Sequence, residues 1–389
     1  MALCLVTAGV ATVFGLVHLW PSNHNPPGVI GQAFAAPGVT FPEASVVTVT
    51  PFRCDAAGEP SSSTEGVEPS QCAHLEVTIE TGVNEGDSVT VDAPQAVYQS
   101  GVSAGDGVQL VRVPPTNGAP ATYTFFDFDR KLPLAALALI FAIVVVAVAR
   151  LRGAFALAGI GVATLVLVKF MLPALLQGES AFAVGLVGSS AIMFVVIYLA
   201  HGPSMRSSTA LAGTLIGSLI TAFVGARGVQ FTQLTGLSGD DTSLLSAVAN
   251  NVSLQGLLTC GVIVAGLGIL NDVTITQASA VWELRATDPE LTRRQVFVTS
   301  MRIGRDHIAS SVYTIVFAYA GAALPVLLLI EVYQRGLVNV LVNETVAEEI
   351  VRTLASGIGL VLAVPVTTAI AVLCEPRGVP LRHRESPAG

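Results

Sequence analysis

Residues 132–149 read LPLAALALIFAIVVVAVA and contain no charged side chain. Apolar runs of about 18 residues or more are long enough to cross the hydrocarbon core of a bilayer as one helix. Such runs recur along the chain, and we predict eight transmembrane helices. They cover residues 2–20, 132–149, 154–172, 181–200, 208–226, 254–270 or beyond, 308–330 and 350–373. The fold class indicated is mostly α: a polytopic membrane helix bundle, with seven of the helices in residues 132–374.

The composition agrees with a membrane protein. Of the 389 residues, 52% are hydrophobic and 12% are charged, and the mean hydropathy is +0.69. A typical soluble domain is about one quarter charged. The net charge is -8 and no basic stretch resembles a nucleic-acid footprint, so we expect the lipid bilayer and no nucleic acid as a partner.

Lysine and arginine concentrate in the cytoplasmic loops of membrane proteins, and here their distribution predicts the orientation. With the amino terminus inside, eleven of the 19 Lys and Arg residues fall on short inner segments. These are Arg150, Arg152, Arg206, Arg285, Arg293, Arg294, Arg302, Arg305, Arg377, Arg382 and Arg384. The outer loops after helices three, five and seven hold only Arg227 and Arg335, beside the acids Glu179, Asp240, Asp241, Glu344, Glu348 and Glu349. We predict that both termini are cytoplasmic, with residues 375–389 as an inner tail.

The first apolar segment has two interpretations. We favour residues 1–20 as a first transmembrane helix that is not cleaved. The alternative is a secretory signal peptide, for which Ala33-Phe34-Ala35 resembles a cleavage site. The long distance to that site and the intervening Pro26-Pro27 favour the uncleaved helix.

Residues 21–131 form the one sizeable polar segment, which the predicted orientation places outside the cell membrane. Short alternating runs between turn residues predict five strands, at residues 45–50, 74–80, 87–91, 108–113 and 122–126. A small all-β barrel of OB-like size fits this count. Cys54 and Cys72 lie in this segment, and they form either a disulfide or two free thiols.

Polar side chains interrupt the end of the sixth predicted helix and the start of the seventh. On helical spacing, Asp272, Thr276 and Ser279 share a stripe, and His307, Ser311 and Thr314 share another. Both segments are expected toward the cytoplasmic side, where they can meet and bind a cation or pass a proton. The candidate path comprises Asp272, Thr276, Gln277, Ser279, Arg305, Asp306, His307, Ser310, Ser311 and Thr314.

A purely structural interpretation stays open for the same residues. Arg302 and Asp306 are four apart and can pair along one helix surface. Serine and threonine often hydrogen-bond between transmembrane helices, and Asp272 can end a helix among the lipid headgroups.

Catalytic signatures are absent. The sequence has no nucleophile elbow, P-loop, HExxH motif or His/Cys metal cluster, so we expect no metal, no cofactor and no enzyme.

Three strings carry a family resemblance: LNDVTITQAS at 270–279, IGRDHIAS at 303–310 and AYAGAALP at 318–325. They resemble the signature of the YibE/F-like family of bacterial membrane proteins, and we expect the likeness to extend over the chain after about residue 40. The resemblance implies a multi-pass protein of the bacterial plasma membrane, and it implies little about activity.

Three functions remain for comparison. The first is transport of an ion or small solute along the polar path between the sixth and seventh helices. The second is a membrane scaffold that does not transport and whose outer domain binds an envelope protein. The third is a membrane-embedded enzyme that uses Asp272, Asp306 and His307.

Overall fold

A computed structural model describes residues 1–21, 38–54, 70–115, 120–238, 242, 245–246, 251–333 and 336–375. The chain divides into two compact units, one of residues 1–27 with 145–389 and one of residues 28–144, and each is described by itself. The expected cleavage site at Ala33–Ala35, Pro26-Pro27, the loop residues Arg335, Asp240 and Asp241, and the arginines of the tail lie outside the described residues.

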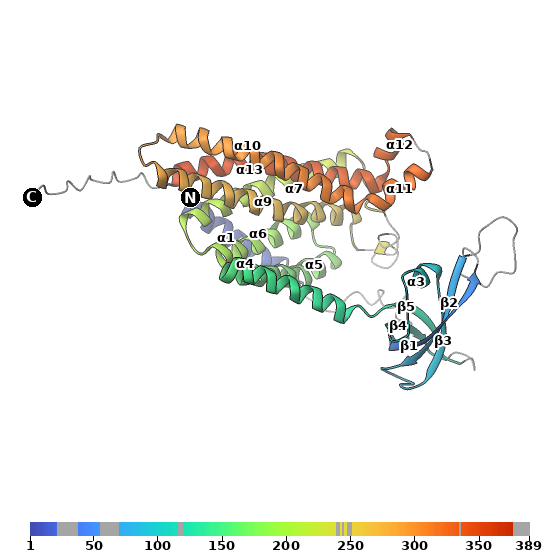
Figure 1. The fold of residues 1–389 in the computed structure, drawn as a ribbon. Coiled ribbons are helices and arrows are strands. Elements are labelled where there is room, and N and C mark those ends of the chain that lie inside the picture. Colours follow the sequence, from blue (N-terminus) through green and yellow to red (C-terminus); the bar gives the residue numbers. More distant parts are fainter. Residues whose placement is uncertain are drawn as a thin grey trace, which may run out of the picture. The chain divides into compact units, whose positions relative to one another are not determined.

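The first unit is helical (Figure 1). Its elements are α1 (Ala2–His18), the end of α4 (Lys131–Val166), the π-helical turn η1 (Leu167–Met171), α5 (Leu172–Leu176), α6 (Ala181–His201), α7 (Met205–Phe231), α9 (Leu254–Thr287), α10 (Arg293–Ala322), α11 (Leu324–Val332), α12 (Leu337–Leu341) and α13 (Glu344–Cys374). In the described part of the chain, five helices are long and apolar enough to cross a membrane, or six if α10 and α11 form one bent span. Several spanning helices were predicted correctly, whereas the count of eight is not confirmed.

The predicted spans differ from the helices for local reasons. The spans predicted at 132–149 and 154–172 fall in one helical stretch that is interrupted at Arg150, where φ is 53° and ψ is -133°. Gly153 permits the close approach there, since a Cβ on it would lie 2.5 Å from the Val145 carbonyl oxygen. The span predicted at 308–330 is bent by 59° between α10 and α11, where Pro325 supplies no backbone N–H.

The packing of α7, α9 and α13 depends on small residues. A Cβ on Gly213 would lie 2.0 Å from Thr367 Oγ1, and one on Gly217 would lie 2.7 Å from Leu270 Cδ2. These two glycines form the GxxxG pattern of α7. In lipid, where apolar surfaces gain little by leaving the solvent, such close contacts are a main source of helix association.

The ends of several helices meet at one end of this unit. Arg206 at the start of α7 lies 3.7 Å from Glu283 of α9, and Arg285 forms an ion pair with Glu375 just after α13. Met1 Sδ lies 3.3 Å from Cys374 Sγ. The start of the chain and the end of α13 therefore share one end of the bundle, in agreement with termini on the same side; which side is the cytoplasm stays a prediction.

The second unit contains an antiparallel sheet of order β3-β2-β1-β4-β5. The strands are β1 (Glu43–Cys54), β2 (Ser70–Ile79), β3 (Ser88–Ala93), β4 (Gly107–Val113) and β5 (Thr122–Phe128), and α3 (Gln95–Gln99) follows β3. All five predicted strands are present with longer or shifted ends, and α3 was not predicted. Alternate side chains such as Val46, Leu75 and Leu110 form the core.

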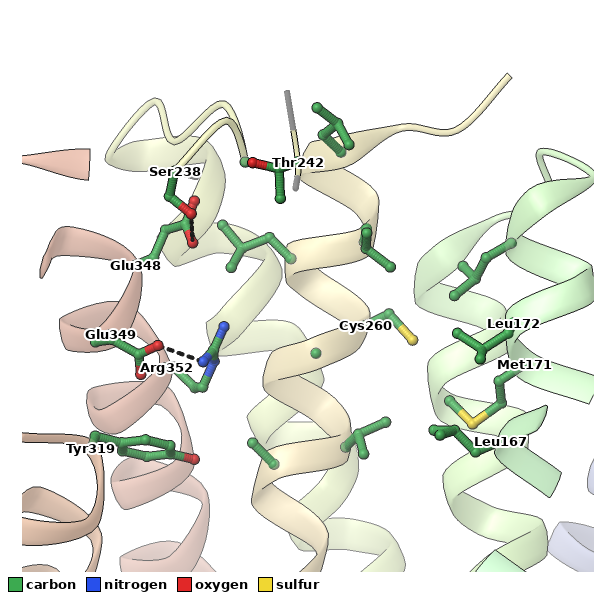
Figure 2. A pocket seen from close by; sticks show the side chains of 18 residues that line it. Leu167, Met171, Leu172, Ser238, Thr242, Cys260, Tyr319, Glu348, Glu349 and Arg352 are labelled. Atoms are coloured by element: carbon green, nitrogen blue, oxygen red, sulfur yellow. Dashed lines mark hydrogen bonds and ion pairs between the residues drawn. The ribbon is translucent and has the colours of Figure 1, made fainter. Parts of the chain in front are cut away.

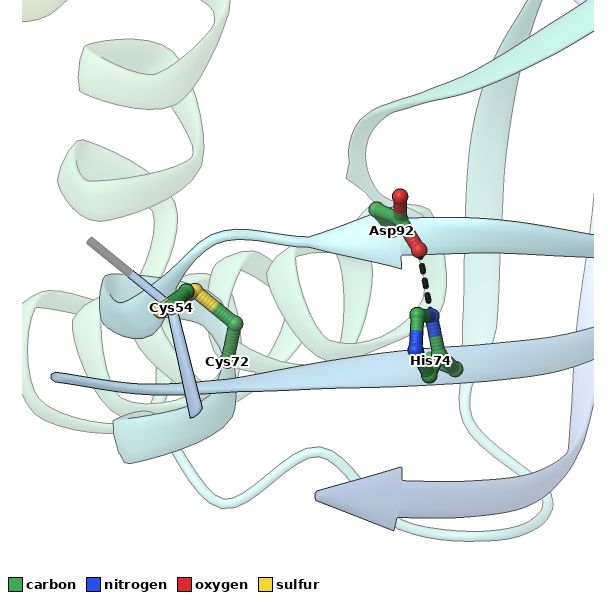
Figure 3. Close-up of a disulfide and its surroundings, with 4 residues drawn as sticks. All are labelled: Cys54, Cys72, His74 and Asp92. Atoms are coloured by element: carbon green, nitrogen blue, oxygen red, sulfur yellow. Dashed lines mark hydrogen bonds and ion pairs between the residues drawn. A yellow bond between two sulfur atoms is a disulfide. The ribbon is translucent and has the colours of Figure 1, made fainter. Parts of the chain in front are cut away.

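A disulfide joins the ends of β1 and β2 (Figure 3). Cys54 and Cys72 are bonded, with their Cα atoms 5.7 Å apart, so the disulfide alternative is the correct one. Nearby, His74 Nδ1 lies 2.5 Å from Asp92 Oδ1 and the His74 ring stacks on Phe52. Disulfides are typical of oxidising compartments, so the bond is compatible with the outer position that we predicted for this unit.

Removal of the disulfide should destabilise the sheet. Because the bridge closes a loop of 18 residues, Cys54→Ser should lower the free energy of unfolding of this unit by about 3 kcal/mol. Faster amide hydrogen exchange in β1 and β2 of the full chain in nanodiscs would report the loss. The exposed free thiol Cys4 provides the control, because Cys4→Ser should leave the exchange unchanged. Equal exchange in Cys54→Ser and wild type would contradict the stabilising role.

Two glycines of α13 should respond oppositely to alanine. A Cβ on Gly359 would lie 1.9 Å from Thr221 Oγ1 and 3.3 Å from the Gly217 carbonyl oxygen, whereas one on Gly357 would meet nothing within 4 Å. Gly359→Ala should destabilise by about 1–3 kcal/mol through overpacking, and Gly357→Ala should be neutral or stabilise by up to about 1 kcal/mol through helix propensity. Thermal unfolding in detergent compares them, and equal Tm values would refute the close packing.

Candidate functional site

The structure brings together the acid and the histidine that the sequence singled out. Asp272 Oδ2 of α9 lies 3.5 Å from His307 Nε2 of α10. The two side chains are 67% and 30% exposed, so the pair is open on one side. His307 Nε2 is itself buried and has no hydrogen-bond partner among the described residues, so the exposed part of the pair is the Asp272 carboxylate.

The position of Asp272 differs from the expectation that it lies near the cytoplasmic end of its helix. α9 is a continuous helix of 34 residues, longer than predicted, and Asp272 lies near its midpoint. At 1.5 Å per residue the helix is about 50 Å long, compared with a hydrocarbon core of about 30 Å. Asp272 is therefore far from both ends of α9.

One face of α9 carries Asp272 and is otherwise sparsely covered. Gly261, Gly268 and Asp272 lie on this face at spacings of seven and four, and Ser279 continues it. We call this set the open face of α9. A Cβ on Gly261 or Gly268 would meet no atom within 4 Å, whereas the opposite side of α9 is buried against α7 and α13.

Two pockets lie along the open face. The Arg152 pocket, of about 570 Å³, has Arg152, His201, Gly268 and Asn271 in its wall. The second pocket, of about 620 Å³, lies nearer the start of α9, against residues 254–265, and we call it the Glu348 pocket. Both contain Leu167 and Val264 in their walls and thus adjoin.

The remaining candidates of α9 have different surroundings. Thr276 and Ser279 are partly exposed near Asp272. Gln277 is 2% exposed, and its Nε2 donates a 2.9 Å hydrogen bond to the Ser300 carbonyl oxygen of α10. Gln277 thus acts as a structural link between helices, as does the buried Thr214–Thr274 hydrogen bond of 2.6 Å.

On α10 the candidates separate into two faces. His307 and Ser311 are partly buried, whereas Arg305, Asp306, Ser310 and Thr314 are exposed. Thr314 Oγ1 donates to the Ser310 carbonyl oxygen within its own helix. In the described part of the chain, no ion pair joins Arg302 to Asp306, so the surface pairing that we considered for them is not observed. Only His307 among the α10 candidates is paired with Asp272.

The Glu348 pocket contains charged residues that the sequence analysis did not select (Figure 2). Its wall includes Glu348, Glu349 and Arg352 of α13, Ser238 and Tyr319. Glu349 Oε1 accepts a 2.6 Å hydrogen bond from Arg352, and Glu348 Oε2 accepts a 2.8 Å bond from Ser238. Glu348 is 8% exposed, and its Oε1 has no partner among the described residues.

A third glutamate fixes the rim of this pocket. Glu344 Oε1 accepts hydrogen bonds from the backbone N–H of Thr235 at 2.6 Å and of Gly236 at 2.9 Å. It also accepts a 2.6 Å bond from the Thr235 hydroxyl. These bonds join the segment after α7 to the first turn of α13 and so position Ser238 beside Glu348.

These residues were missed because we started the last helix at residue 350 and assigned the glutamates to an outer loop. In the structure α13 begins at Glu344, after the N-cap Asn343, whose side chain accepts a hydrogen bond from the Thr345 N–H. An asparagine before several good helix formers is a helix-start signal that the sequence does contain.

Metal ligation has no obvious site. Over the described ranges, no three His, Cys, Asp or Glu side chains come close enough to share a metal ion.

The chain is similar to a known protein family. The profile of the family described as YibE/F-like protein matches residues 137–377, more than half of the chain. The match includes α9, α10 and α13 and begins after the sheet, so the likeness expected from about residue 40 is confirmed only from residue 137. Neither the curated proteins nor the solved structures contain a significant match. This multi-pass membrane protein belongs to the YibE/F-like family.

Proposed function

We propose that this protein carries a small cation across the membrane along the open face of α9. The observation that carries the proposal is the Asp272–His307 pair near the midpoint of α9, open on one side and in line with Gly261 and Gly268. The two adjoining pockets on that face supply space between the start of α9 and Asp272, along residues 254–271.

The energetics favour a working role over a structural one. An aspartate at the centre of a transmembrane helix costs about 2.5–3.5 kcal/mol on insertion scales. An exposed pair at 3.5 Å returns little of that, because largely exposed ion pairs contribute about 0–1 kcal/mol. Structural links in this bundle are instead buried and satisfied, as in Thr214–Thr274.

The chemistry of the pair suits cation passage. A carboxylate attracts a cation, and an imidazole can carry a proton and donate it to a neighbouring acceptor. When His307 is protonated it satisfies Asp272, and when it is neutral the carboxylate is free for another cation. The pair therefore couples cation binding to the presence of a proton on His307.

The sheet of the second unit is separate from the proposed cation path. Its strand order, with α3 between β3 and β4, favours the OB-like barrel that we predicted. We assign it no part in the cation path. In the competing scaffold function it would bind an envelope protein, and the membrane helices would only anchor it.

Neutral substitutions at the pair test the proposal. In proteoliposomes loaded with H⁺-, Na⁺- or K⁺-sensitive dyes, Asp272→Asn and His307→Gln should lower cation flux at least tenfold. Asp306→Asn is the matched control: it removes the same charge from an exposed site next to His307 and should leave flux unchanged. Size-exclusion profiles verify folding of each variant. Wild-type flux no higher than in protein-free liposomes, with normal assembly, would favour the scaffold and refute transport.

Filling the open face should block the path without disturbing the fold. A Cβ at Gly268 meets no atom within 4 Å, so Gly268→Leu should fold normally and reduce flux at least fivefold by occupying the space beside Asp272. Gly321→Leu, equally uncrowded but on α10 away from the pair, should have no effect. The same dye assay measures both. Unchanged flux in Gly268→Leu would exclude a path along this face.

A further inference from the structure

We infer that the Glu348 pocket binds an organic cation with an apolar body, with Glu348 as its counter-ion. That this ligand is also transported rests on the function proposed above. That it binds to the pocket does not rest on that function. The inference stands on the charge, the shape and the wall chemistry of the pocket.

The charge of the pocket is unbalanced at Glu348. Two carboxylates and one guanidinium line it, and Glu349 takes the guanidinium of Arg352 at 2.6 Å. Glu348 then forms no ion pair among the described residues: it feels the Arg352 guanidinium only at longer range, and its one hydrogen bond comes from the neutral Ser238 hydroxyl. A carboxylate that is 8% exposed carries a large desolvation penalty unless a positive group accompanies it.

The free oxygen of Glu348 shows where that positive group belongs. Oε1 is buried and has no hydrogen-bond partner in the described chain, while Oε2 is bonded to Ser238. An ammonium group donates up to three hydrogen bonds and would satisfy Oε1. The Tyr319 ring, in the same wall, offers a second surface that attracts a cation.

The opposite wall is apolar. Figure 2 shows Glu348, Glu349 and Arg352 on the α13 side and Leu167, Met171 and Leu172 across the pocket. The volume of about 620 Å³ is within the range of sites that hold small organic molecules. A ligand that fills this space therefore needs an apolar body as well as a positive group.

An inorganic ion fits the pocket less well. Calcium requires six to eight oxygen ligands, and magnesium keeps an octahedral oxygen shell. Here one free carboxylate faces leucine and methionine side chains, and the described residues include no group of acids able to share a metal ion. A zwitterion is also disfavoured, because Glu349 already compensates Arg352.

Binding to the purified full chain in nanodiscs tests the inference, with radiolabelled 2-phenylethylammonium as the probe in equilibrium dialysis. Unlabelled 2-phenylethanol, phenylalanine and Ca²⁺ serve as neutral, zwitterionic and inorganic competitors. In wild type the amine should bind at least tenfold more tightly than the alcohol, and neither phenylalanine nor Ca²⁺ should displace it at equal concentration. Glu348→Gln should weaken amine binding at least tenfold while alcohol binding stays unchanged.

Two further variants keep the result interpretable. Glu290→Gln removes an exposed acid from the α9–α10 connection and should leave amine binding at the wild-type value. Gly261→Leu fills the pocket at a position where a Cβ meets nothing within 4 Å, and should abolish binding of amine and alcohol alike.

Several outcomes would overturn the inference: no amine binding to wild type, equal affinity for amine and alcohol, displacement by Ca²⁺ or phenylalanine, or full amine binding in Glu348→Gln. The proposed transport fails separately. Amine binding without any cation flux would leave this site standing and remove the transport, and Asp272-dependent flux without amine binding would do the reverse.

Discussion

The close approach of α7, α9 and α13 is the constraint from which the other features of the helical unit follow. It exists because Gly213, Gly217 and Gly359 have no Cβ where the side chains of Thr367, Leu270 and Thr221 pack from the neighbouring helices. Since α9 is held along its length by two neighbours, it runs unbroken for 34 residues and presents its opposite face to open space. That continuity carries Asp272 to the middle of the helix, just beyond the part of α9 that lines the two pockets.

Polar groups in the helical unit fall into two classes, and the difference is informative. Thr214, Thr274 and Gln277 are buried and fully used between helices. Glu348 Oε1 and His307 Nε2 are buried without a hydrogen-bond partner in the described chain, as are several hydroxyls such as those of Ser189 and Thr367. Burial of either class costs desolvation free energy, but only in the first class do hydrogen bonds within the protein offset that cost. The second class is where an external ligand would complete the chemistry.

The sheet unit is stabilised by different interactions from those of the helical unit. Its core depends on strand alternation, and the Cys54–Cys72 bridge restricts the unfolded chain between β1 and β2. The family match begins at residue 137 and leaves this unit out. The family membership therefore bears on the helices of residues 137–377 and carries no information about the sheet.

The local sequence pattern was sufficient to predict several features of the fold. Apolar length predicted the spanning helices, alternation predicted the five strands, and the IGRDHIAS and LNDVTITQAS strings indicated the family, because each of these is written in residues near one another along the chain. We also expected that the segments of Asp272 and His307 can meet, since both interrupt neighbouring helices. The position of Asp272 along its helix was not foreseen: α9 extends beyond its apolar run, because packing against α7 and α13 keeps polar residues helical. Only the tertiary structure decided where the Glu348 pocket forms, because its wall comes from four distant segments that contain Ser238, Tyr319, Glu348 and Leu167. No local sequence pattern records which of their atoms remain without a hydrogen-bond partner.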